Sequence, residues 1–92
     1  MTEPKFTPGP WSINEWPQAA SDIAIGAVGT PLIARVPLRD VSINEQKANA
    51  NLIAAAPDLF NALLVAEESV GDLDSLEIVR AALAKARGEI HD

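Results

Sequence analysis

Polar side chains gather in the middle of the chain, in a stretch rich in alanine. Asn44, Lys47 and Asn51 follow one another at steps of three and four residues, so a helix would place them on one side. Asn49 lies about 100° or more from each of its neighbours on the same helix. Because the first turn of a helix presents N–H groups that favour anions, this spacing predicts an anion-binding site, and a solvated helix face is the alternative.

Two arginines and a tryptophan upstream could belong to the same site. Arg35 and Arg39 flank the end of a predicted strand, and guanidinium groups bind phosphate or carboxylate through paired hydrogen bonds. Trp16 offers a flat ring on which a base can stack. We expect a small pocket if these residues converge with the asparagines. The alternatives are packing of the tryptophan, and surface pairing of the arginines with carboxylates such as Glu15, Asp40 and Glu45.

The sequence contains no standard catalytic set. It has no cysteine and a single histidine, His91, and it lacks both a G-x-S-x-G motif and a glycine-rich phosphate loop. Five acidic residues could bind a cation, but they have neither the spacing nor the glycine of an EF-hand: Glu67, Glu68, Asp72, Asp74 and Glu77. We therefore expect a binding protein rather than an enzyme, with no metal and no cofactor. The acidic side chains should cap helices or face solvent.

Size and charge restrict the partners. The 92 residues predict a single domain, 1–92, with a thin core that makes self-association an expected source of stability. The net charge is -6, with five acids and three bases in residues 1–46 and eight acids and four bases in residues 47–92. This balance opposes direct binding to a nucleic-acid backbone. We expect a homo-oligomer whose partner is a small ligand or a basic protein.

The N-terminus and the hydropathy pattern predict a soluble protein. Residues 1–10 hold three prolines and no apolar segment, and no run of about eighteen apolar residues follows. The absence of cysteine fits a reducing compartment. We expect an intracellular protein that makes no contact with a membrane.

Short alternating segments predict strands in the first half of the chain. After an extended lead-in over 1–10, residues 11–37 predict an antiparallel three-stranded meander, with a first strand from Trp11 and others over 23–28 and 32–36. The last two strands are separated by Gly29, Thr30 and Pro31, so we expect a tight hairpin there.

Capping signals predict helices in residues 43–88. Ser42 and Glu45 have the spacing of a capping box, so a helix should begin at residue 43. Pro57 lacks the N–H that a helix interior needs, so it should kink or break this helix. We predict helices over 43–55 and 57–70.

A last helix is predicted over 75–87, with Gly71 ending the helix before it and Asp74 as its N-cap. Two apolar seams have steps of three and four residues: Leu52, Ala56, Leu59, Leu63, Ala66 and Val70, then Leu76, Val79, Leu83, Ala86 and Ile90. The seams predict an antiparallel hairpin. The expected fold is α+β, with the small N-terminal meander packed on a C-terminal helical hairpin.

Three segments carry a resemblance to a known family. They are Phe-Thr-Pro-Gly-Pro-Trp over 6–11, Ala-Asn-Ala-Asn-Leu-Ile-Ala-Ala-Ala-Pro-Asp-Leu over 48–59, and Ala-Leu-Ala-Lys-Ala-Arg-Gly-Glu over 82–89. The chain resembles a family of small bacteriophage and prophage accessory proteins over nearly its whole length. The resemblance implies a product that acts in the host cytoplasm, and no reaction comes with it.

Three functional hypotheses follow, because small phage proteins without catalytic residues often act by binding and blocking. The first is an anti-defence protein that sequesters a small nucleotide-derived host immune signal at an oligomer interface. Its ligand-binding residues would be Trp16, Arg35, Arg39, Asn44, Lys47, Asn49 and Asn51. The second is a protein-binding inhibitor of a host defence complex, similar to anti-CRISPR proteins, that uses an acidic helical face. The third is a structural homo-oligomer without a ligand.

Overall fold

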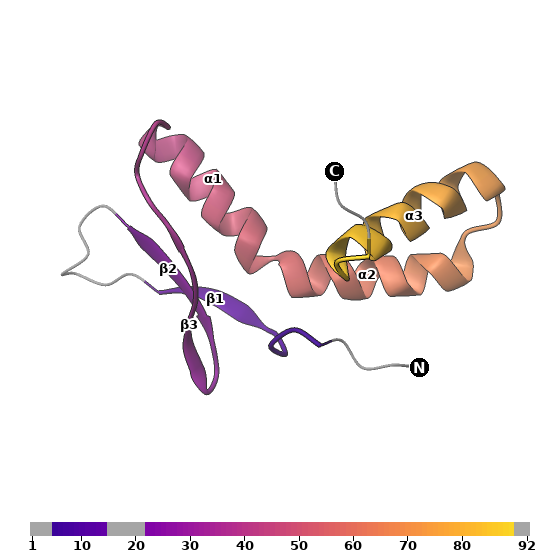
Figure 1. Cartoon of the computed structure of the whole chain (residues 1–92), viewed down its shortest axis with the longest axis horizontal. Helices are drawn as coiled ribbons and strands as arrows, with labels where there is room; N and C mark the ends of the chain where they lie inside the picture. Colours follow the sequence, from indigo (N-terminus) through magenta and orange to yellow (C-terminus); the bar gives the residue numbers. More distant parts are fainter. Residues whose placement is uncertain (1–4, 15–21, 90–92) are drawn as a thin grey trace. The chain divides into compact units, whose positions relative to one another are not determined.

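The computed structural model describes residues 5–14 and 22–89 of the chain (Figure 1). The chain divides into two compact units, Met1–Pro57 and Asp58–Asp92. An N-terminal antiparallel sheet of three strands is followed by three helices, so the predicted α+β class is confirmed.

The sheet is a meander of β1 (Trp11–Asn14), β2 (Ile23–Ala27) and β3 (Thr30–Val36), in that order. Ile13 pairs with Ile25, and Ile25 pairs with Ala34, which places apolar side chains from all three strands on one face. The predicted meander is therefore confirmed.

The hairpin between β2 and β3 differs from the prediction in its position. The turn consists of Val28 and Gly29, whereas Thr30 already pairs with Ala27 and Pro31 lies inside β3. Gly29 has a φ of 82°, which glycine adopts without strain, so one glycine is enough to reverse the chain.

A bulge explains how Pro31 fits into β3. The register of β2 and β3 shifts between Ile25 and Ala27. At Gly26, within this shift, a Cβ atom would collide with the carbonyl oxygen of Pro31. Because proline cannot donate to the ladder, a bulge opposite a glycine accommodates it.

Helix α1 (Ile43–Ala54) packs on one face of this sheet (Figure 1). Ile25, Val36 and Ala50 are buried together at the centre of the contact. The buried side-chain amide of Gln46 donates a hydrogen bond of 2.9 Å to the carbonyl oxygen of Val36. This bond attaches the first turns of α1 to the end of β3.

The lead-in packs against the same unit. The Trp11 indole N–H donates to the carbonyl oxygen of Thr7 at 3.0 Å, and the Phe6 ring meets Trp11 edge to face with centroids 6.1 Å apart. Gly9 lies against the buried Pro57, where a Cβ atom would be 3.0 Å from two carbons of the proline ring. The described part of the lead-in, residues 5–10, is bent at Lys5, Phe6 and Gly9 rather than extended as predicted, because the Trp11 side chain holds Thr7 and Phe6 back against it. Residues 1–4 lie outside the described residues.

The predicted break near Pro57 is confirmed. α1 ends at Ala54, and α2 (Ala56–Ser69) begins at Ala56, so Pro57 occupies the first turn of α2, where a missing N–H removes no helical hydrogen bond. None of the described helices is by itself long and apolar enough to cross a bilayer, and only α1 and α2 counted together, across their break, would meet that requirement.

In the second unit, α2 and α3 (Leu73–Ala86) form an antiparallel hairpin (Figure 1). Glu67 and Arg80 form an ion pair of 3.5 Å, and the Arg87 guanidinium lies 5.7 Å from the centre of the Phe60 ring. Glu67 lies seven residues after Phe60 on α2, and its partner Arg80 lies seven residues before Arg87 on α3. Both contacts therefore belong to one antiparallel register, with Leu83 fully buried between them along α3.

The ends of α3 differ from the prediction. The N-cap is Asp72 rather than Asp74, because the Asp72 carboxylate accepts from the Ser75 backbone N–H at 2.9 Å. Gly71 does not adopt a positive φ; Gly88 does, with a φ of 79°. Its N–H donates to the Lys85 carbonyl oxygen and that of Glu89 to Ala84, a Schellman motif that ends α3.

The first predicted seam is wrong in α1, where Leu52 is 63% exposed. The buried or half-buried positions there are Gln46, Ala50, Ile53 and Ala54. The error arises because one seam was extended across the break at Ala55, although α1 packs on the sheet and α2 on α3. In α2, Leu59 is exposed, while Leu63, Ala66 and Val70 are half-buried as expected.

The second seam is confirmed at its centre. Leu76 and Val79 are half-buried and Leu83 is fully buried. Ala86, in the last turn of α3, is exposed, and Ile90 lies outside the described residues.

Candidate functional site

The polar cluster predicted from the sequence lies on the exposed surface of α1. Asn44, Lys47 and Asn51 are exposed and share one side of the helix, whereas Asn49 is exposed on another. Ser42 caps the helix by accepting from the Glu45 N–H at 3.1 Å, which is half of the predicted capping box. The helix therefore offers a polar side that runs from Asn44 in its first turn to Asn51 in its last, with one of its first N–H groups already satisfied.

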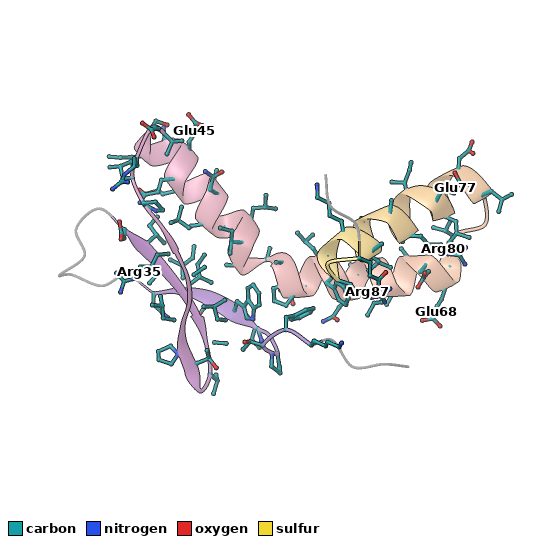
Figure 2. The ribbon with its side chains drawn as sticks, viewed as in Figure 1. Arg35, Glu45, Glu68, Glu77, Arg80 and Arg87 are labelled. Atoms are coloured by element: carbon teal, nitrogen blue, oxygen red, sulfur yellow. The ribbon has the colours of Figure 1, made fainter. Side chains whose placement is uncertain are left out.

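Arg35 does not join this cluster. Its neighbours Ala34 and Val36 pack toward α1, and because successive strand residues point to opposite faces, Arg35 points to the other side of the sheet. Figure 2 shows Arg35 on the side of the sheet away from α1. The single sequence could not have revealed this separation, because it depends on which face of β3 meets the helix.

The two remaining candidates are placed differently. Arg39 is exposed in the connection between β3 and α1, next to Asp40, whose φ of 65° turns the chain. Trp16 lies outside the described residues.

A second group of exposed side chains lies around the turn between α2 and α3. We call this surface the acidic tip, and it consists of Glu68, Asp72, Leu73, Asp74 and Glu77, all of them exposed. Figure 2 shows Glu77 on α3 and Glu68 on α2 near this end of the hairpin, on opposite sides of it. Glu67, by contrast, is half-buried and paired with Arg80. The tip therefore combines four carboxylates from both helices and their connection.

Asp72 has a structural role within the tip. Hydrogen bonds from Ser75, first from its backbone N–H and then from its side chain, lower the pKa of Asp72 below the ordinary value of 3.8. The carboxylate therefore remains charged at neutral pH while it caps α3. This outcome agrees with the expectation that part of the acidic group caps a helix.

Leu73 is the member of the tip that sequence reasoning missed. It is 76% exposed, between the two aspartates at the start of α3. An exposed leucine inside an acidic surface suits contact with an apolar group that has basic neighbours. The signal in the sequence is an apolar residue between two aspartates, just before the predicted helix over 75–87.

The two surfaces differ in the groups that they present. In the part of the chain that the structure describes, no group of three or more histidine, cysteine or acidic residues could hold a metal ion. The α1 surface presents amides and one ammonium group, and the tip presents carboxylates and one aliphatic side chain.

The comparison with protein families places the chain in a family. A family model described as Salmonella phage P22 protein Y8K6 matches residues 1–90. The chain belongs to this phage protein family. No curated protein and no solved structure matches it.

Membership in the phage P22 Y8K6 family confirms the resemblance to a phage protein family that the three segments predicted. The matched residues of the Y8K6 family include both the polar surface of α1 and the acidic tip. The choice between the two surfaces therefore depends on their geometry.

Proposed function

We propose that this phage protein is a non-catalytic inhibitor that binds a host defence protein through the acidic tip. The observation that carries the proposal is the exposure of Leu73 among Asp72, Asp74 and Glu77. An apolar contact supplies affinity, and the surrounding carboxylates select a basic partner and speed its association.

The partner class follows from the charges. Carboxylates from two helices can occupy positions that phosphates would occupy on a nucleic-acid-binding protein. A host protein with a basic, partly apolar nucleic-acid-binding surface fits this chemistry, and the net charge of -6 favours its approach.

The experiment compares two triple variants in phage-infected cells that carry an active defence system. The tip variant Glu68→Gln, Leu73→Ser, Glu77→Gln leaves the Asp72 cap intact, and we expect it to weaken partner binding about tenfold or more and to lose protection of the phage. The control variant Asn44→Ala, Lys47→Ala, Asn51→Ala should protect fully. Protection by the tip variant at wild-type level would refute the proposal.

A second candidate function is sequestration of a small nucleotide-derived host signal by α1. It is favoured by the shared exposed side of Asn44, Lys47 and Asn51, where amides could bind base or ribose edges and the ammonium a phosphate. If this second function is correct, the variant Asn44→Ala, Lys47→Ala, Asn51→Ala should fail to protect the phage, and the tip variant should still protect it.

Native mass spectrometry tests this second candidate directly. Protein purified from cells with an activated nucleotide-signalling defence should carry an additional small mass that is lost on denaturation. The same preparation of Asn51→Ala should lack that mass. A wild-type protein without any bound mass would count against sequestration.

A further inference from the structure

Helix α3 has a second stripe, on the side opposite its contact with α2. Asp74, Ile78, Ala81 and Lys85 follow one another at steps of four, three and four residues, and all four are exposed. Ile78 is 71% exposed, although Leu76, Val79 and Leu83 already supply the stripe that faces α2. These steps are those of a coiled-coil seam, in which each helix contacts another helix along its length.

The residues of this outer stripe are complementary to a second copy of themselves. If two α3 helices pack antiparallel about a two-fold axis between residues 79 and 80, Ile78 of one copy lies beside Ala81 of the other. The same register places Asp74 beside Lys85 at both ends. One symmetric arrangement therefore pairs a large side chain with a small one and an acid with a base, twice each.

We propose that the protein forms a two-fold dimer through the outer stripe of α3. A parallel arrangement would place Asp74 beside Asp74 and Lys85 beside Lys85, so like charges oppose it. The antiparallel contact is isologous, the commonest form of protein self-association. It spans about 16 Å of helix, so we expect a weak dimer that depends on concentration.

This inference does not rest on the proposed function. In the dimer, the two acidic tips lie toward opposite ends of the α3 pair. Asp74 belongs to both the acidic tip and the outer stripe, so the two proposals are separated by variants at other residues. The tip variant Glu68→Gln, Leu73→Ser, Glu77→Gln changes no residue of the stripe and should leave the dimer intact, and Ile78→Asp changes no residue of the acidic tip.

Sedimentation equilibrium of the full chain, from about 1 µM to about 1 mM, measures the dissociation constant. Ile78→Asp places two carboxylates at the centre of the contact, and we expect a monomer at every concentration. Val65→Asp is the matched control, because Val65 is 64% exposed on α2, and it should dimerise like the wild type. Circular dichroism establishes that both variants remain folded.

A charge exchange tests the register. Asp74→Lys alone and Lys85→Asp alone should each weaken the dimer about tenfold, because each change acts at both ends of the contact. The double variant Asp74→Lys, Lys85→Asp should recover most of the wild-type affinity. A wild-type protein that stays monomeric, a dimer that survives Ile78→Asp, or a double variant that recovers nothing would each overturn the proposal.

Discussion

At the scale of single residues, Asp72 and Leu73 are neighbours in the acidic tip but differ in the contacts that they make. Asp72 holds the first turn of α3 through Ser75, and its hydrogen bonds are made within the hairpin. Leu73, the next residue, is largely exposed. A substitution at Asp72 therefore tests stability, whereas one at Leu73 tests binding.

The lowered pKa of Asp72 predicts a dependence of stability on pH. A carboxyl group with a lower pKa in the folded state contributes stability that is fully present above its unfolded pKa, near 3.8, and is lost as the pH falls through the folded value. Asp72→Asn keeps an amide cap but removes the charge. Thermal unfolding followed by circular dichroism should show the wild type more stable than this variant at neutral pH, with the difference vanishing in acid. A difference that stays unchanged as the pH falls well below 3.8, through the lowered pKa of the folded state, would contradict the assignment.

At the scale of elements, the helices could be predicted better than their buried faces. The capping signal at Ser42 and the break at Pro57 are local, so the ends of α1 and α2 were predicted to within one residue. The start of α3 was shifted because two aspartates compete for the N-cap, and spacing alone does not choose between Asp72 and Asp74. The buried face of α1 depends on the sheet, which no local pattern describes, and Leu52 was consequently assigned to the core.

A pair of alanine variants tests the corrected faces. Leu83→Ala removes a fully buried side chain, and we expect the free energy of unfolding to fall by about 3 kcal/mol. Leu52→Ala removes an exposed one and should change it by less than about 0.5 kcal/mol. Urea unfolding measures both values. An equal loss of unfolding free energy in the two variants would mean that Leu52 is buried, as the predicted seam from Leu52 to Val70 requires.

At the scale of the whole molecule, the candidate site could be predicted only in part. Spacing on one helix is sufficient to group Asn44, Lys47 and Asn51, and the structure places them together on one exposed side. Whether Arg35 lies near that group depends on which face of β3 meets α1. Ala34 and Val36 pack toward α1, so Arg35 points away from it. The acidic tip was visible as a run of charge, but its exposed leucine acquires meaning only when α2 and α3 are seen as a hairpin.

The division of the chain at Pro57 also has a consequence for the order in which its two units fold. Each unit takes its contacts from one continuous stretch of chain, and the sheet with α1 belongs entirely to the first stretch. A ribosome adds about 5 to 20 residues per second, so the 35 residues from Asp58 to Asp92 take about 2 to 7 s to synthesise. The sheet can therefore begin to fold during translation, before α2 and α3 are complete.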